Sequence, residues 1–223
     1  AQHDSALLKD TTFLKTAIGA AQQAPDTQAL LAFSGAAVRN FPNDASFWKA
    51  RGAAWELAGK TDSAVAAYVK SLAINPSDMN STLLVAKALV DGTNYDTIAV
   101  RDCRGDTACV RPIRDRFVAQ LDSARSYLDR AVSSADTTAQ VTAAALMRTA
   151  GEKLARAGAS DAAYRWLDRT LQILAPRTPA DTNGVRQRIR VNASFWFGLA
   201  STPGLSAAYS AMAKTKNCDQ AKA

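Results

Sequence analysis

The feature that most constrains the fold is a pattern of helical spacing that occurs twice in the chain. Within 45–78, Trp48, Gly52 and Trp55 lie four and three residues apart, so they share one face of a helix. Gly59 ends that helix, and Asn75-Pro76 ends a second one. The same pattern returns 99 residues later, where Met147, Gly151, Leu154, Gly158, Ala163, Leu167 and Thr170 correspond to Trp48, Gly52, Trp55, Gly59, Ala64, Tyr68 and Ser71. The chain therefore contains a repeated helical hairpin, because shared composition alone would not preserve the spacing.

The segment 45–78 resembles a tetratricopeptide repeat. Its first helix carries a bulky, a small and a bulky residue, and its second carries small, aromatic and small residues before a proline. Arg51 departs from the pattern, because the family usually has an aliphatic residue there. The resemblance implies helix pairs that stack, bury a continuous core and leave an extended concave groove.

The whole sequence predicts an all-α fold, a right-handed α-solenoid of about five antiparallel helix hairpins with one inserted loop. No segment shows the sustained alternation of β-branched residues that predicts a sheet. Aromatic residues at helical spacing usually pack inside, so Trp48, Trp55, Tyr68 and Trp166 are expected in the core. The predicted parts of this single solenoid domain are a degenerate helix pair at 1–44, repeats at 45–78, 79–133 and 138–177, and a C-terminal helix pair at 183–215. Residues 91–116, inside the second of these repeats, form the expected loop.

Two of the three cysteines, Cys103 and Cys109, flank a short segment that contains Gly105. Such a segment can bring two β-carbons to disulfide distance. A zinc site lacks ligands, because His3 is the only histidine. We therefore expect a disulfide, with two free thiols as the alternative. A disulfide, together with a first residue that is not methionine, favours an extracytoplasmic protein, periplasmic or secreted.

The formal net charge is +7, and the acidic residues are almost all aspartate, with Glu56 and Glu152 as the exceptions. We expect these aspartates at helix caps, in turns and on solvated faces, with Asp62 capping the second helix of 45–78. A cluster of arginines in 91–116 suggests a module that binds anionic glycan or nucleic acid. Asp102, Asp106 and Asp115 lie among those arginines and lower their field, which makes nucleic acid an unfavoured partner.

Candidate binding residues follow from the resemblance, which places the first helix of each repeat along the groove. The predicted groove residues are Lys49, Ala53, Glu56, Asn80, Leu83, Lys87, Val90, Arg148 and Glu152. Asn80 and Asn192 also match the N-glycosylation pattern. The C-terminal pair is rich in apolar residues for a capping repeat, so Phe195, Trp196, Tyr209 and Cys218 form a candidate assembly surface.

No catalytic constellation occurs in the sequence. The single histidine lies near the N-terminus, a poor place for a preorganised base, and no pair of carboxylates stands out. No apolar run reaches the roughly 18 to 20 residues that span a bilayer. The sequence thus predicts a non-enzymatic scaffold without cofactor or metal, which binds a protein or peptide. The alternatives are a self-assembling structural subunit and the basic module described above.

Overall fold

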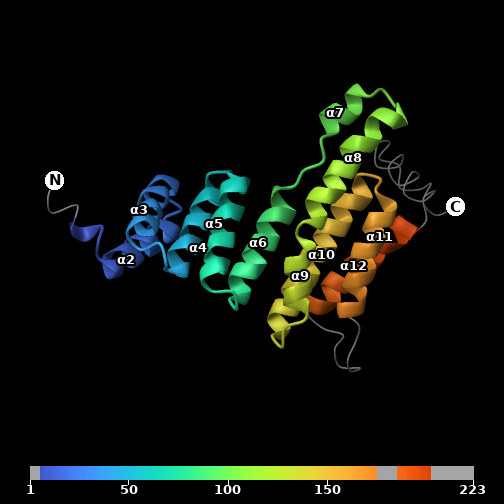
Figure 1. The fold of residues 1–223 in the computed structure, drawn as a ribbon. Coiled ribbons are helices and arrows are strands. Elements are labelled where there is room, and N and C mark those ends of the chain that lie inside the picture. Colours follow the sequence, from blue (N-terminus) through green and yellow to red (C-terminus); the bar gives the residue numbers. More distant parts are fainter. Residues whose placement is uncertain (1–5, 175–184, 202–223) are drawn as a thin grey trace. The chain divides into compact units, whose positions relative to one another are not determined.

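The computed structural model describes residues 6–174 and 185–201, and all regular secondary structure within them is α-helical (Figure 1). The predicted all-α class is confirmed for this part of the chain. The chain divides into two compact units, Ala1–Gly92 and Thr93–Ala223. This division falls inside the predicted repeat at 79–133. The second helix of the predicted C-terminal pair, together with Tyr209 and Cys218, lies outside the described residues.

Within the described residues of the first unit, five helices each pack against the next along the chain. They are α2 (Thr11–Gln23), α3 (Thr27–Asn40), α4 (Ala45–Leu57), α5 (Thr61–Ile74) and α6 (Met79–Gly92). Every helix places a large side chain in the interior, and Leu14, Leu30, Phe47, Tyr68 and Val85 are all fully buried. Each such side chain contributes about 1.5–3 kcal/mol relative to an exposed one.

Within the described residues, the helices of the second unit range in length from 6 residues in α7 to 20 residues in α10. Its helices are α7 (Thr97–Asp102), α8 (Thr107–Asp122), α9 (Arg125–Val132), α10 (Thr137–Arg156), α11 (Ser160–Ile173) and α12 (Val185–Ser201). Helix α10 contacts α9, α11 and α12. Helix α10 buries Met147 and Leu154, and α11 buries Trp166 and Leu167.

Aspartate begins most of these helices, as the sequence predicts. The side chains of Asp10, Asp26, Asp44, Asp96, Asp106 and Asp136 each accept a hydrogen bond from a backbone N–H of the first turn. Asp62 is an exception, and its predicted role as a cap is wrong. Helix α5 begins at Thr61, directly after the residue at its N-cap position, Lys60, and Asp62 lies in the first turn. A carboxylate there still interacts favourably with the helix dipole.

The prediction of a loop at 91–116 is wrong, because much of this segment is helical. The caps Asp96 and Asp106 start α7 and α8, and Gly105 makes the turn between them with a φ of +89°. Helix α8 continues past the end of the expected loop to Asp122, and α9 follows at Arg125. The Cys103 and Cys109 sulfurs lie at disulfide distance, with 5.6 Å between the Cα atoms, as predicted. This link joins the end of α7 to the first turn of α8.

The repeated hairpin is present at the level of single contacts. Gly59 (φ +69°) lies two residues after the end of α4, and Gly158 (φ +71°) lies two residues after the end of α10. The next amide closes each turn in the same way, Lys60 N–H to the Trp55 carbonyl at 2.8 Å and Ala159 N–H to the Leu154 carbonyl at 2.9 Å. This closure is the Schellman motif, which favours glycine at the left-handed position.

Two of the four aromatic residues expected in the core are only half-buried. Tyr68 and Trp166 are buried, as predicted. The indole N–H of Trp48 donates instead to the Pro42 carbonyl at 2.7 Å, and the Trp55 ring stacks under the Arg51 guanidinium, 4.3 Å from the ring centroid. Both tryptophans flank the buried side of α4, which is made by Phe47, Ala50, Gly52 and Ala54.

Candidate functional site

A hollow of about 580 Å³ lies on the first unit, and we call it the first-unit hollow. Its lining comes mainly from α2, α4 and α6, with one ring from α5 between them. The residues that line it are Lys15, Ile18, Gly19, Gln22, Ser46, Phe47, Lys49, Ala50, Ala53, Glu56, Tyr68, Asn80 and Leu84. Four of the predicted groove residues, Lys49, Ala53, Glu56 and Asn80, are therefore brought together.

One charged cluster joins α4 to the start of α6. The Lys49 ammonium donates to the Asp78 carboxylate at 2.9 Å. The same carboxylate accepts from the Ser81 hydroxyl at 2.8 Å and from the Asn80 backbone N–H at 3.0 Å. Burial works to raise the pKa of Asp78, but the hydrogen bonds from Lys49 and Ser81 outweigh it and hold that pKa below its usual value. Asp78 therefore stays ionised at neutral pH.

A second cluster centres on Glu56 of α4. Its carboxylate accepts from the Tyr68 hydroxyl at 2.5 Å and from the Lys87 ammonium at 3.3 Å. Lys87 also pairs with Asp91, one turn along α6, at 3.0 Å. Burial and the bond to Glu56 raise the pKa of Tyr68, so its hydroxyl remains a donor. Burial works to lower the pKa of Lys87, but Asp91 and Glu56 outweigh it and raise that pKa.

The third cluster, at the α2 side, is looser. Lys15 lies 3.7 Å from the Asp44 carboxylate, and Asp44 also accepts from the backbone N–H and the hydroxyl of Ser46 at 2.8 and 2.6 Å. Burial works to raise the pKa of Asp44, and the bonds from Ser46 together with Lys15 lower it overall. Every charged side chain that faces the first-unit hollow thus has an opposite charge beside it.

Three predicted groove residues of α6 do not line the first-unit hollow. Leu83 is half-buried, and its neighbour Leu84 takes the place in the lining. Lys87 contributes through its contact with Glu56. Val90 is fully buried, so its prediction as a groove residue is wrong. The error has a simple geometric cause, because successive side chains of a helix point in different directions. The neighbour of a solvated residue can therefore point into the core.

The remaining predicted groove residues, Arg148 and Glu152, lie on α10 in the second unit. The Glu152 carboxylate pairs with Arg148 at 2.8 Å and with Arg156 at 2.6 Å. Arg148 also donates to the side-chain oxygen of Asn192 on α12 at 3.0 Å. These side chains form a separate polar ladder, and they do not belong to the first-unit hollow.

The candidate assembly surface is only partly exposed. Phe195 is 48% exposed, but Trp196 is only 9% exposed and lies under the Arg156 guanidinium. Trp196 is therefore part of the interior of the second unit, contrary to the prediction. Both asparagines of the glycosylation pattern, Asn80 and Asn192, are exposed on helices.

The contribution of α2 to the first-unit hollow was not predicted from the sequence. Lys15, Ile18, Gly19 and Gln22 line it, and their spacing of three, one and three residues is that of one helical face. That spacing was the only signal, since the segment 1–44 departs too far from the repeat pattern to assign a groove position.

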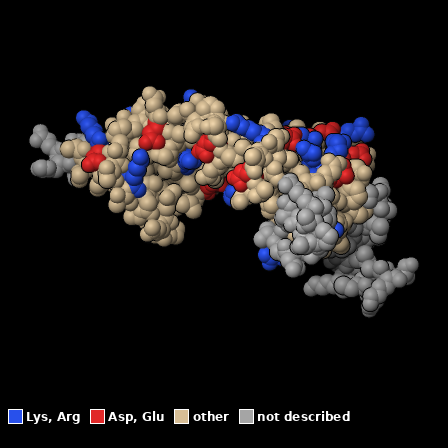
Figure 2. All heavy atoms as spheres, turned by 90° about the horizontal axis from the view of Figure 1, so that it is seen from below, with Lys and Arg blue, Asp and Glu red and all other residues tan. Residues whose placement is uncertain are grey.

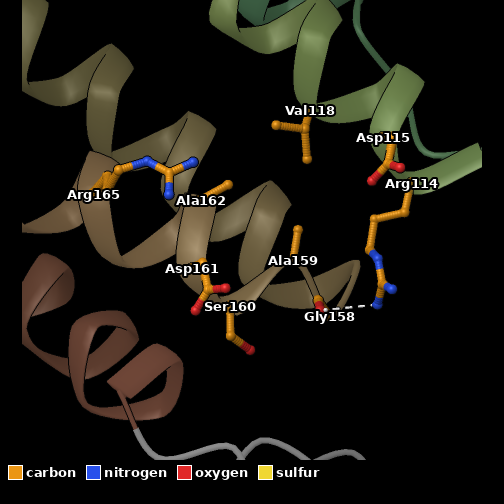
Figure 3. A pocket seen from close by; sticks show the side chains of 9 residues that line it. All are labelled: Arg114, Asp115, Val118, Gly158, Ala159, Ser160, Asp161, Ala162 and Arg165. Carbon is orange, nitrogen blue, oxygen red and sulfur yellow. Dashed lines mark hydrogen bonds between the residues drawn. The ribbon is translucent and has the colours of Figure 1, made fainter. Parts of the chain in front are cut away.

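A smaller hollow of about 460 Å³ lies in the second unit, where α8 faces the start of α11 (Figure 3). Arg114 reaches across to donate to the Gly158 carbonyl at 3.3 Å. Arg165 also lines this hollow, but Asp115 and Asp161 balance the two arginines. On the face drawn in Figure 2, acidic and basic side chains are likewise interspersed over the described residues.

No protein-family model matches this chain, and no curated protein matches it either. Within the described residues, no helix is both long and apolar enough to cross a membrane. The same residues contain no group of three or more His, Cys, Asp or Glu side chains that could hold a metal ion.

Proposed function

We propose that this chain is a non-enzymatic scaffold or adaptor of the tetratricopeptide-repeat type that binds a peptide segment of another protein in the first-unit hollow. The observation that carries this proposal is the lining of that hollow by every second helix, α2, α4 and α6. Helices that alternate in this way leave an extended surface on one side of a stacked array. The volume lies within the roughly 300–1,000 Å³ of typical ligand sites.

Two observations support the architecture within this proposal. Successive helices of the first unit pack against one another in chain order. The α4–α5 and α10–α11 hairpins also share their glycine turns at the same spacing. Both features suit a right-handed α-solenoid of stacked hairpins. The cysteine pair at disulfide distance suits an exported protein, in a periplasmic or secreted location.

Filling the first-unit hollow tests the proposal. A β-carbon at Gly19 would meet no atom within 4 Å, so Gly19→Trp places a ring in the hollow without displacing the core. Ala53→Trp fills the hollow from the opposite helix. Ala20→Trp is the matched control, because Ala20 is exposed on α2 and does not line the hollow.

The probe is a phage-displayed library of random peptides, panned on the immobilised full chain. We expect clones that bind the unmodified chain and Ala20→Trp but do not bind Gly19→Trp or Ala53→Trp. Circular dichroism of all three variants checks that they fold. If every binding clone tolerates both substitutions, the first-unit hollow is not the binding site.

Self-assembly is a second candidate function, and the exposure of α12 favours it. Val191 is 58% exposed and Phe195 is 48% exposed, and they lie one turn apart on the same face of the helix. Exposed apolar side chains on one helix face suit a contact between copies, which gives open filaments when the rotation does not close. Light scattering and negative-stain imaging test this idea. Assemblies that the double variant Val191→Asp, Phe195→Asp dissolves would support it, and a monomer at high concentration would refute it.

The third candidate function is an anion-binding module. The distribution of charge favours it for the second unit but not for the first. Residues 1–92 contain 8 Lys or Arg and 8 Asp or Glu, whereas residues 93–223 contain 19 and 12, so the whole excess of +7 lies in the second unit. Binding to heparin that weakens steeply with added salt would support this candidate, since released counterions produce such a dependence. A flat salt titration would remove it.

A further inference from the structure

We infer that the first-unit hollow selects an extended peptide segment that carries no charged side chain, an inference that rests on the proposed function and names its ligand class. Three lysines face four carboxylates in and around the hollow, and each lysine contacts at least one carboxylate at 3.7 Å or less. An acidic ligand therefore meets no cation without a partner.

The carboxylates are equally engaged. Asp78 accepts three hydrogen bonds, and Glu56 accepts from both Tyr68 and Lys87. Asp44 accepts two bonds from Ser46 and lies beside Lys15. A basic ligand would compete with these partners, and a partly buried charge that loses its partner is strongly destabilising. Neither sign of ligand charge is favoured by this arrangement.

Two polar groups in the lining remain open. The side-chain amides of Gln22 on α2 and Asn80 on α6 make no hydrogen bond to any of the described residues. Each amide offers a carbonyl acceptor and two N–H donors, which match the N–H and C=O groups of a peptide backbone. The hollow can thus hold a backbone through uncharged groups.

The lining of the hollow also contains large apolar residues and several small residues. Ile18, Phe47 and Leu84 supply apolar surface, and Gly19 and Ala53 leave space open. Such a lining accommodates small apolar side chains, whose burial is favourable without any fixed charge. Together with the open amides, it describes an uncharged segment with small side chains.

The panning experiment described above also tests this inference. Clones that Gly19→Trp excludes are sequenced, and their peptides are synthesised and titrated against the full chain. We expect sequences depleted in Asp, Glu, Lys and Arg. We also expect a Kd that changes less than about 2-fold between about 0.05 M and about 1 M NaCl, because screening weakens only charged contacts. Gln22→Ala and Asn80→Ala should each weaken binding by roughly 2- to 10-fold through a lost hydrogen bond.

The outcomes separate this inference from the proposed function. Peptides that Gly19→Trp excludes but that carry a fixed charged residue, or whose Kd rises 10-fold or more with salt, overturn the uncharged ligand and leave the hollow as the binding site. A single Asp or Lys introduced into a selected peptide gives a second reading. Tighter binding of either variant overturns the inference, and weaker binding of both supports it. If no peptide is excluded by either Gly19→Trp or Ala53→Trp, the proposed function fails together with the inference.

Discussion

The close contact between α4 and α5 allows a quantitative prediction at Gly52. A β-carbon on this residue would overlap the ring of Tyr68, which is 1% exposed. The ring cannot move aside freely, because its hydroxyl donates to Glu56 at 2.5 Å. Gly52→Ala therefore has two opposing effects on stability. Alanine is the better helix former, but its β-carbon overfills the contact with Tyr68.

The magnitudes favour destabilisation. Replacing glycine by alanine inside a helix contributes about 1 kcal/mol of stability. Overpacking a core costs about 1–3 kcal/mol, and loss of a hydrogen bond to a charged group costs about 1.5–3 kcal/mol. Together these three terms give an expected net loss of roughly 1.5–5 kcal/mol for Gly52→Ala. Gly151→Ala should lose less, because its β-carbon would meet Leu167 at 2.6 Å, and that side chain has no polar anchor.

Gly19→Ala is the matched control, since Gly19 is also inside a helix but its β-carbon would meet no atom within 4 Å. This variant should gain about 0.5–1 kcal/mol. Urea unfolding gives the stability, and hydrogen exchange of the α4 and α5 amides shows whether the first unit carries the change. If Gly52→Ala stabilises the chain as much as Gly19→Ala does, the contact with Tyr68 is not close and the reasoning is wrong.

Three further predictions concern a turn, an ion pair and the cysteine link. Gly158→Ala should destabilise the α10–α11 hairpin by about 1–2 kcal/mol in thermal unfolding, because Gly158 has a φ of +71° and a β-carbon disfavours that conformation. Asp78 has a folded pKa below the ordinary value of 3.8, so its contribution is present above pH 3.8 and is lost as the pH falls through the folded pKa. Stability measured against pH should show this loss in the unmodified chain and not in Asp78→Asn. Reduction of the Cys103–Cys109 link should raise hydrogen exchange in α7 by roughly 30-fold, about 2 kcal/mol for so short a loop, while α10 stays protected. Helix α7 has no buried residue to hold it otherwise.

The hairpins could be predicted from sequence because single residues determine their turns. Gly59 and Gly158 each follow the first helix of a hairpin in a left-handed backbone conformation that favours glycine. The residues of each hairpin follow the helical period. The segment 91–116 was harder to predict, because it is an insertion that has no counterpart in the repeat pattern of 45–78. Two aspartate caps, Asp96 and Asp106, start helices that this composition conceals.

The candidate site was predictable where the repeat pattern is strong. Lys49, Ala53 and Glu56 lie on α4, whose register follows from its glycines, and all three line the first-unit hollow. The repeat pattern is weaker on α6 than on α4 and determines its register less well. Val90 was therefore predicted on the groove side of α6, although it is buried. Pairing between helices could not be predicted at all, because the bond from Lys49 to Asp78 depends on how two helices pack.

The two copies of the hairpin explain why the open site lies in the first unit. Ala53 on α4 corresponds to Glu152 on α10, 99 residues later. In the first copy the small side chain leaves the hollow open. In the second copy a carboxylate occupies that position and bridges Arg148 and Arg156 at 2.8 and 2.6 Å. The same hairpin pattern thus gives two different surfaces. The small side chain of Ala53 leaves room for a ligand, whereas Glu152 forms ion pairs with arginines of its own helix. We therefore expect Ala53→Glu to close the first-unit hollow to peptide without disturbing the turn at Gly59.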